Sequence, residues 1–158
     1  MATAIYWKPT GVKTTTIDGS SEVKGHEKKI EAMSLSMGIQ GPGGDKPGRI
    51  SGPRYHSGIS MTCANDKATP VLHKVLVTNE LLKEVVIEMT DTNKEGVDEV
   101  FLTITLTDAA ISDINTSYDA QHSGGDMYSI TLNYRKIEML WADGKHTATD
   151  DLLEPNVK

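Results

Sequence analysis

The sequence predicts an all-β fold with one helix, in a single domain that covers residues 1–158. Two observations lead to this fold class. Apolar and polar residues alternate over most of the chain, which is the period of a half-buried strand, and only one segment repeats its apolar residues at helical spacing. With 158 residues, of which 37% are hydrophobic, the chain is long enough for one core and fits one domain better than two.

The most clearly defined strands are predicted at 84–91 and 97–106. On the first strand, one face carries Val85, Ile87 and Met89. On the second strand, one face carries Val100, Leu102, Ile104 and Leu106. The segment between them, 92–96, is short and polar and ends in glycine, which is typical of a hairpin loop.

Further strands are predicted at 4–8, 28–39, 54–63, 109–117 and 128–142. In two of these, 28–39 and 128–142, the alternation changes phase partway along. Because a change of one residue turns every later side chain to the opposite face, we expect either a bulge or a strand buried on both faces. A strand that is buried on both faces needs a second covering surface, which another subunit would supply.

The one predicted helix begins at Thr69-Pro70. We expect Thr69 to supply the N-cap hydroxyl and Pro70 to occupy the first helical position, where its missing N–H costs nothing. Apolar residues then follow at helical spacing, namely Val71, Leu72, Val75 and Leu76. Asn79 is expected to end the helix in the left-handed region. Such a short helix is not stable alone, so it should pack on the sheet.

Three segments are predicted as loops or irregular chain. Residues 40–53 are rich in glycine and proline, and a loop of this length in a compact domain is usually functional or disordered. Residues 119–127 form a second predicted loop, and the polar tail 143–158 is expected to be irregular.

Charge and composition exclude several function classes. Lys and Arg together number 16 and Asp and Glu 22, which gives a net charge of −6 and argues against a nucleic-acid binder or a polybasic membrane module. No apolar run approaches the roughly 20 residues of a spanning helix, so we expect no membrane insertion. The N-terminus lacks a basic start followed by an apolar block, so we expect no signal peptide. A single cysteine, Cys63, excludes an internal disulfide and a multi-cysteine zinc cluster.

Several partial motifs each lack a necessary residue. The run 91–96 opens like a calcium loop, but the twelfth position, which needs a bidentate carboxylate, is Leu102. The glycines of 41–44 are not followed by the Gly-Lys-Ser/Thr of a phosphate-binding loop. Cys63 shares a strand face with Ile59 and Met61, which favours a small buried hydrophobe over a reactive thiolate.

The five histidines, His26, His56, His73, His122 and His146, are scattered, and none is spaced from another like a pair of metal ligands. His56 faces away from Ile59, so we interpret it as a surface or interface hydrogen-bonding residue. A metal site assembled from distant histidines and a small hydrolase stay open as weak alternatives. The sequence thus predicts no enzyme, no catalytic, cofactor-binding or metal-binding residues, and no cofactor.

One run, Asn65-Asp66-Lys67-Ala68-Thr69-Pro70-Val71-Leu72, is the most specific motif of the sequence. Further motifs are Ile17–Ser20, His26-Glu27 with Ile30-Glu31, Phe101–Leu106 with Asp108-Ala109, Leu132–Ile137 and Asp150-Asp151. In this order, along nearly the whole chain, these motifs resemble the Hcp family, the haemolysin-coregulated proteins of the bacterial type VI secretion system, and the run that begins at Asn65 resembles the family's helix start. The sequence departs from the family pattern at Thr69, where serine is usual, at Asn79, where glycine is usual, and at Leu152, where tryptophan is frequent.

The resemblance implies a small β-barrel of two packed antiparallel sheets with one flanking helix, which assembles into a homohexameric ring. Stacked rings would form the inner tube of the secretion system, which a contractile sheath propels out with the VgrG spike and which can carry effector proteins in its lumen. The subunit would then reside in the bacterial cytoplasm before assembly and be secreted afterwards. An effector-binding carrier or chaperone, acting as a secreted ring, is the alternative.

The same resemblance gives the loop 40–53 a role in ring stacking, because the corresponding loop of the family extends toward the neighbouring ring. The predicted stacking residues are Gly41, Pro42, Gly43, Gly44, Asp45, Lys46, Pro47 and Arg49. Glycine permits close approach to a neighbour, while proline limits the conformational freedom of the loop.

Overall fold

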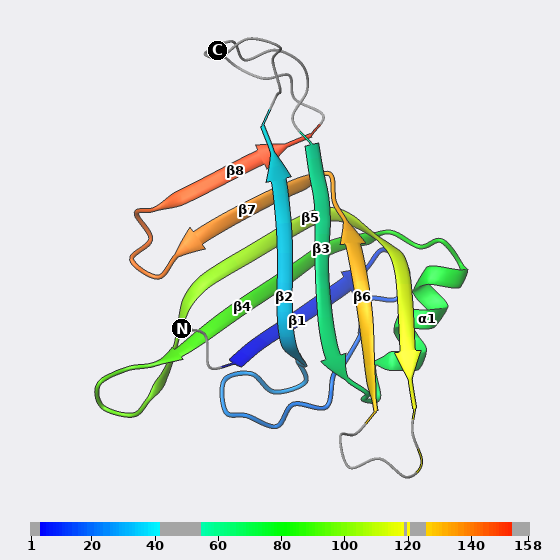
Figure 1. The fold of residues 1–158 in the computed structure, drawn as a ribbon, viewed down its shortest axis with the longest axis horizontal. Coiled ribbons are helices and arrows are strands. Elements are labelled where there is room, and N and C mark those ends of the chain that lie inside the picture. The colour runs from blue at the N-terminus through cyan, green and yellow to red at the C-terminus, as the bar shows by residue number, and fades with distance from the viewer. Residues whose placement is uncertain (1–3, 42–54, 119, 121–125, 153–158) are drawn as a thin grey trace.

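A computed structural model of the chain describes residues 4–41, 55–118, 120 and 126–152 (Figure 1). The elements in chain order are β1 (Ala4–Gly11), β2 (Ile30–Gln40), β3 (Tyr55–Ala64), α1 (Thr69–Val77), β4 (Leu82–Thr92), β5 (Asp98–Ser117), β6 (Met127–Asn133), β7 (Lys136–Trp141) and β8 (Thr147–Asp151). The prediction of an all-β fold with one helix is confirmed.

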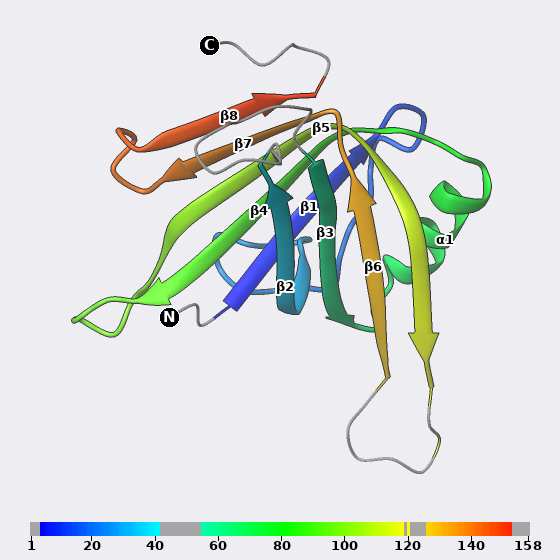
Figure 2. The same ribbon diagram turned by 45° about the horizontal axis from the view of Figure 1, so that its top comes forward.

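The strands close into a barrel with a two-strand extension. Their order is β4-β1-β2-β3-β6-β5-β7-β8, all the pairings are antiparallel, and an additional β4–β5 pairing closes the ring of strands. In Figures 1 and 2, β2, β3 and β6 cross in front of β1, β4 and β7, while the long strand β5 bends from the back layer into the front layer. The β7–β8 hairpin extends the back layer beyond the barrel.

The core lies between the two layers. Its largest fully buried side chains include Trp7 from β1, Ile59 from β3, Ile87 from β4, Ile104 from β5 and Ile130 from β6. Full burial of one such side chain is worth about 1.5–3 kcal/mol relative to its exposure, so each of these residues favours the folded state.

The hairpin predicted around 92–96 is confirmed, since Thr92 pairs with Asp98. Its turn is ordered by Asn93, whose side-chain oxygen accepts hydrogen bonds from the N–H groups of Glu95 and Val97 at 2.9 and 3.0 Å. The separation of 97–106 from 109–117 was wrong, because both belong to the single strand β5. Asp108, with φ 51°, marks where the chain bends between the two layers, a change of direction that the alternation pattern does not reveal.

The two predicted phase changes have different causes. In β2 the register shifts between Ala32 and Ser34, so the predicted bulge is confirmed. In 128–142 the change is a break between β6 and β7 at Tyr134-Arg135, so the prediction of one strand was wrong. The expectation of strands buried on both faces is also wrong for β2 and β6, since their core-facing residues alternate with serine and threonine on the outward side.

The helix α1 begins at Thr69, as predicted, but Thr69 is not its N-cap. The N-cap is Ala68, which makes no side-chain capping bond. The turn is held instead by Asp66, whose carboxylate accepts the Ala68 N–H at 2.9 Å and whose own N–H donates to Thr69 Oγ1 at 3.2 Å. Asn79, with φ 57°, follows the helix in the predicted left-handed conformation.

The tail after residue 143 is not irregular throughout, because Thr147–Asp151 forms β8 and pairs with β7. A strand with the sequence Thr-Ala-Thr-Asp-Asp has no apolar face, which is why the alternation test missed it. Among the described residues, no helix is long and apolar enough to cross a membrane.

Candidate assembly surfaces

The outward side of the front layer is covered by small, uncharged polar side chains. Ser34, Thr62, Ser129 and Asn115 lie side by side in register across β2, β3, β6 and β5, and a second row follows the same order. We call the two rows the polar face, which consists of Ser34, Ser36, Ser60, Thr62, Asp113, Asn115, Ser129 and Thr131. Ser60 Oγ and Thr131 Oγ1 lie 3.2 Å apart, and Asp113 is the one charged member of the set.

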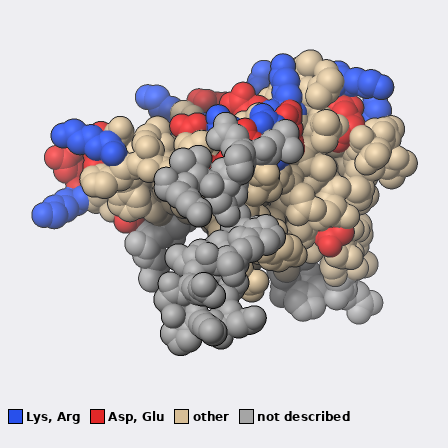
Figure 3. Space-filling model, turned by 90° about the horizontal axis from the view of Figure 1, so that it is seen from above, with Lys and Arg blue, Asp and Glu red and all other residues tan. Residues whose placement is uncertain are grey.

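The outward side of the back layer carries charges between threonines. We call this surface the charged face, and its charged members are Lys8, Glu84, Glu88, Lys136, Glu138 and Asp151. In Figure 3, seen from above, charged side chains gather along the upper edge, which is the side turned away from the viewer in Figure 1. Lys8 pairs with Asp18 at 2.5 Å, and Lys29 pairs with Glu88. The hydrogen bond from Lys8 lowers the pKa of Asp18.

Two strand edges of the front layer lack a partner among the described residues. β1 pairs with β2 only along Ile30–Ala32, so from Met33 onward β2 pairs with β3 alone. Beyond Ala110, β5 pairs with β6 alone. Both edges therefore present main-chain N–H and C=O groups, and they lie at opposite sides of the polar face.

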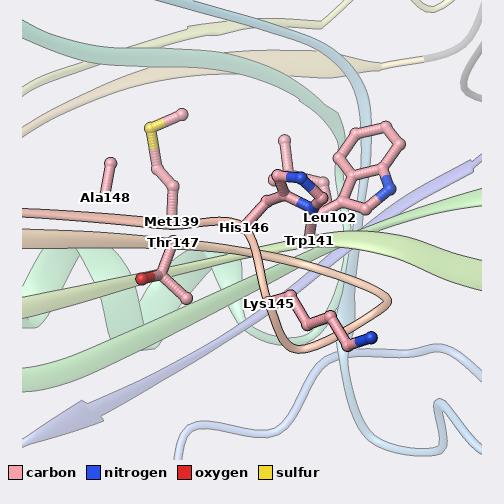
Figure 4. A pocket seen from close by; sticks show the side chains of 7 residues that line it. All are labelled: Leu102, Met139, Trp141, Lys145, His146, Thr147 and Ala148. Carbon is pink, nitrogen blue, oxygen red and sulfur yellow. The ribbon is translucent and has the colours of Figure 1, made fainter.

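A groove of about 670 Å³ lies on the core-facing side of the β7–β8 extension. We call it the hairpin groove, and its lining residues are Leu102, Met139, Trp141, Lys145, His146, Thr147 and Ala148. In Figure 4 the side chains of Met139, Trp141, His146 and Ala148 project from the same side of the hairpin. Trp141 is 47% exposed, which is unusual for the largest apolar side chain. The groove is thus an apolar surface that the described residues leave uncovered.

The turn that closes the hairpin groove is held by Asp143. Its carboxylate accepts the N–H groups of Lys145 and His146 at 2.8 and 3.2 Å and lies 2.5 Å from the His146 ring nitrogen Nδ1. The Lys145 N–H makes the largest contribution to lowering the pKa of Asp143. Trp141 also contacts Phe101 edge to face, with ring centroids 5.5 Å apart. The walls of the groove are therefore ordered by contacts within the chain.

The acidic pair at the end of β8 fastens the extension to the barrel. Asp150 lies 2.6 Å from Nε2 of His56, whose Nδ1 lies 2.7 Å from the Tyr134 hydroxyl. Arg135 donates to Asp151 at 2.6 Å and to Asp108 at 2.8 Å, and these bonds raise the pKa of Arg135. The His56 side chain is only 3% exposed, so it is a hydrogen-bonding residue, as predicted, but inside the protomer rather than on its surface.

The structure offers little chemistry elsewhere in its described part. No group of three or more His, Cys, Asp or Glu side chains there is placed to hold a metal ion. Cys63 is fully buried, which confirms its interpretation as a small hydrophobe. Burial raises the pKa of its thiol to about 11, so the thiol is protonated at neutral pH.

The predicted site residues are not brought together into one described site. Gly41 is exposed directly after β2, while Pro42, Gly43, Gly44, Asp45, Lys46, Pro47 and Arg49 lie outside the described residues. Thr69 and Pro70 begin α1 at another part of the molecule. Sequence reasoning missed the hairpin groove altogether. The one available signal was Trp141 at the end of an apolar strand, and it did not show which side would be uncovered.

Comparisons with known proteins agree in both sequence and fold. Residues 6–141 match the family described as "Type VI secretion system effector, Hcp". The chain is 28% identical over 169 residues to the "Major exported protein" of Pseudomonas aeruginosa, with 98% of each chain covered.

Two solved structures are similar along almost their whole length. A crystal structure of an Hcp protein is 27% identical with a TM-score of 0.86, and the match covers 95% of this chain and 99% of that one. The secreted protein Hcp3 from Pseudomonas aeruginosa is 26% identical with a TM-score of 0.74, and the match covers 95% and 98% of the two chains. Together with the barrel, its single helix and the sequence motifs, these matches show that the chain belongs to the Hcp family of the type VI secretion system.

Proposed function

We propose that this protein is a non-enzymatic structural subunit of the inner tube of a type VI secretion system, assembled as stacked homohexameric rings. The observation that carries the proposal is the pair of strand edges, on β2 and on β5, that pair with no other described strand and lie at opposite sides of one sheet. Unprotected edges are normally avoided in monomeric proteins because they pair with other chains. Two different edges on one protomer suit a head-to-tail contact, which gives a closed ring when the rotation closes.

In such a ring the polar face would line the lumen. Joining the β2 edge of one copy to the β5 edge of the next continues the front sheet around the ring, so this face points to one side throughout. Hydroxyl and amide side chains make weak, adaptable contacts. Because the polar face is almost without charge, it would not bind positively or negatively charged proteins strongly. A lumen of this kind suits the passage of effector proteins of differing charge, while the charged face would look outward toward the contractile sheath.

The loop 40–53 is proposed as the contact between stacked rings, with the VgrG spike capping the end of the tube. It emerges between β2 and β3, beyond Gly41 and before Tyr55, at one end of the front sheet. We expect deletion of residues 41–49 to weaken stacking while the barrel stays folded. Tubes that form unchanged from the deletion variant would refute this role of the loop.

The proposal is tested by the mass and shape of the purified protein. Light scattering and negative-stain images at micromolar concentration and moderate salt should show closed six-membered rings, whereas monomers alone would contradict it. Because each copy adds a net charge of −6, like-charge repulsion opposes stacking, and added salt should lengthen the stacks. Rings that bind effector proteins but never stack under any condition would favour the carrier alternative. Secretion from the bacterial cytoplasm would follow from expulsion of the tube.

A further inference from the structure

We propose that the hairpin groove receives the exposed C-terminal end of α1 from a second copy of this chain, behind the paired edges of the front sheet. This contact rests on the proposed ring, and it identifies the surfaces of neighbouring copies that meet in the back layer. The helix-end patch is defined as Val12, Val77 and Leu81, of which Val77 is the last residue of α1.

The hairpin groove lies on the side of the molecule that carries the free edge of β2. In Figure 1, β7 passes behind β2 and continues past that edge, away from β3. Leu35 and Met37 of β2 and Leu102 and Met139 of the groove are all partly buried residues that pack against the core. The apolar interior of the barrel therefore continues outward into the groove, where Trp141 is left 47% exposed.

The helix-end patch lies at the other end of the molecule. α1 packs against β5, with Thr69, Leu72 and Val75 facing inward, and Figures 1 and 2 place it on the opposite side of the barrel from the β7–β8 turn. Val77 is 82% exposed, Val12 57% and Leu81 48%. Val12 and Leu81 are adjacent, since the Val12 N–H donates to the Leu81 carbonyl at 3.0 Å.

These two surfaces meet if the front-sheet edges meet. The groove lies behind the free edge of β2, and α1 lies behind the free edge of β5, so a head-to-tail contact through those edges brings the neighbour's helix toward the groove. Each of the two surfaces exposes apolar side chains among polar ones, and their contact would bury Trp141 and Val77, which are 47% and 82% exposed in the protomer.

Charge favours an apolar contact over an ion-paired one. Lys145 borders the groove, Lys74 lies on the last turns of α1, and the nearby Glu80 is already held by the Thr14 hydroxyl and main-chain N–H. Lys145 and Lys74 carry the same charge, so they cannot form an ion pair across the contact. Because salt screens their repulsion, the contact should become stronger as salt is added.

Cross-linking tests the contact directly. The double variant Val77→Cys/Ala148→Cys, treated with a short bis-maleimide, should give a ladder of covalent multimers. Either single variant alone should give none, and an equimolar mixture of the two single variants, combined before assembly, should give dimers only. Cys63 is fully buried and supplies no competing thiol. The matched control Val97→Cys/Ala148→Cys replaces another exposed valine, on the β4–β5 hairpin, and should not cross-link.

The outcomes separate this inference from the proposed function. If the double variant forms rings by light scattering but yields no ladder, or if the Val97 control cross-links instead, the groove contact is refuted and the ring stands. If every variant and the unmodified chain are monomeric, both proposals fail.

A second measurement uses no engineered thiol. Trp141→Ala and Val77→Ser should each raise the concentration at which half of the rings dissociate by about tenfold or more, whereas Val97→Ser should leave it unchanged. If all three variants have the same dissociation midpoint, the groove does not bind a second copy. The same conclusion would follow if a peptide from another protein were found bound in the groove of the assembled rings.

Discussion

The two outward surfaces of the barrel, the polar face and the charged face, are built on strands with the same alternation but carry different side chains. Across β2, β3, β6 and the end of β5 the outward residues of the polar face are serine, threonine and asparagine, with Asp113 as the one charged member. Across β1, β4, β7 and β8 they include lysine, glutamate and aspartate. Both layers send their alternate residues into one common core.

This difference separates the residues that folding requires from the residues that are free to serve the proposed assembly. The core requires only that every second residue be apolar, so the outward positions are free to serve the surroundings of each layer. A surface in bulk solvent usually mixes charges of both signs, as the charged face does. A broad surface almost without charge is suited to an enclosed space, which is the basis for placing the polar face in the lumen.

The largest expected difference is in the free energy of unfolding, between substitutions on the two sides of strand β6. Leu132→Ala removes a fully buried side chain of β6 and should lower the free energy of unfolding by about 2–5 kcal/mol. Thr131→Ala, one residue away on the polar face, should change it by less than about 0.5 kcal/mol. Urea unfolding of both variants measures the contrast, and similar costs would mean that the polar face contributes to folding after all.

A charge placed on each face should distinguish the enclosed surface from the exposed one. Thr131→Lys would gather one added lysine per copy around a shared lumen and should raise the ring dissociation midpoint by roughly tenfold at low salt, with recovery at high salt. Thr105→Lys puts the same side chain on the charged face and should have little effect. Sedimentation across a salt series compares them, and equal sensitivity would remove the distinction between the faces.

The smallest expected effect is that of acid, which should lower the local stability of the charged face before that of the polar face. The pKa of Asp18 is lowered in the folded state by its bond to Lys8, so its contribution to stability is present above the unfolded pKa and is lost as the pH falls through the folded value. Hydrogen exchange between pH 5 and pH 3 should therefore show faster exchange at β1 and residues 17–29 first. The variant Asp18→Asn should remove that early change, and exchange that begins in β3 and β6 instead would contradict the assignment.

Alternation and local turn chemistry were sufficient to predict the hairpin at 92–96, the bulge in β2, the burial of Cys63 and the end of the helix at Asn79. Each of these depends on residues close together in the chain. The bend at Asp108, the strand β8 and the burial of His56 depend on contacts between distant segments, such as Arg135 with Asp108 and Asp151. No local pattern encodes such pairings.

The candidate surfaces were harder to predict from the sequence than the fold. The polar face requires the register of four strands, and register becomes visible only when Ser34, Thr62, Ser129 and Asn115 are seen to lie side by side. The phase changes in the predicted strands 28–39 and 128–142 are equally compatible with strands buried on both faces, because a bulge in β2 and the break between β6 and β7 produce the same sequence pattern. Self-association was inferred from that pattern, but the support for it now comes from the free edges.

We propose that copies of this chain join through the edges of β2 and β5 with the polar face turned inward. A three-dimensional reconstruction of the purified assembly by electron microscopy tests it most directly. We expect a closed ring of six copies in which Ser34, Ser60 and Thr131 face the central channel and the charged face lies outside. Monomers only, or rings with Lys8, Glu84 and Glu138 facing the channel, would contradict it.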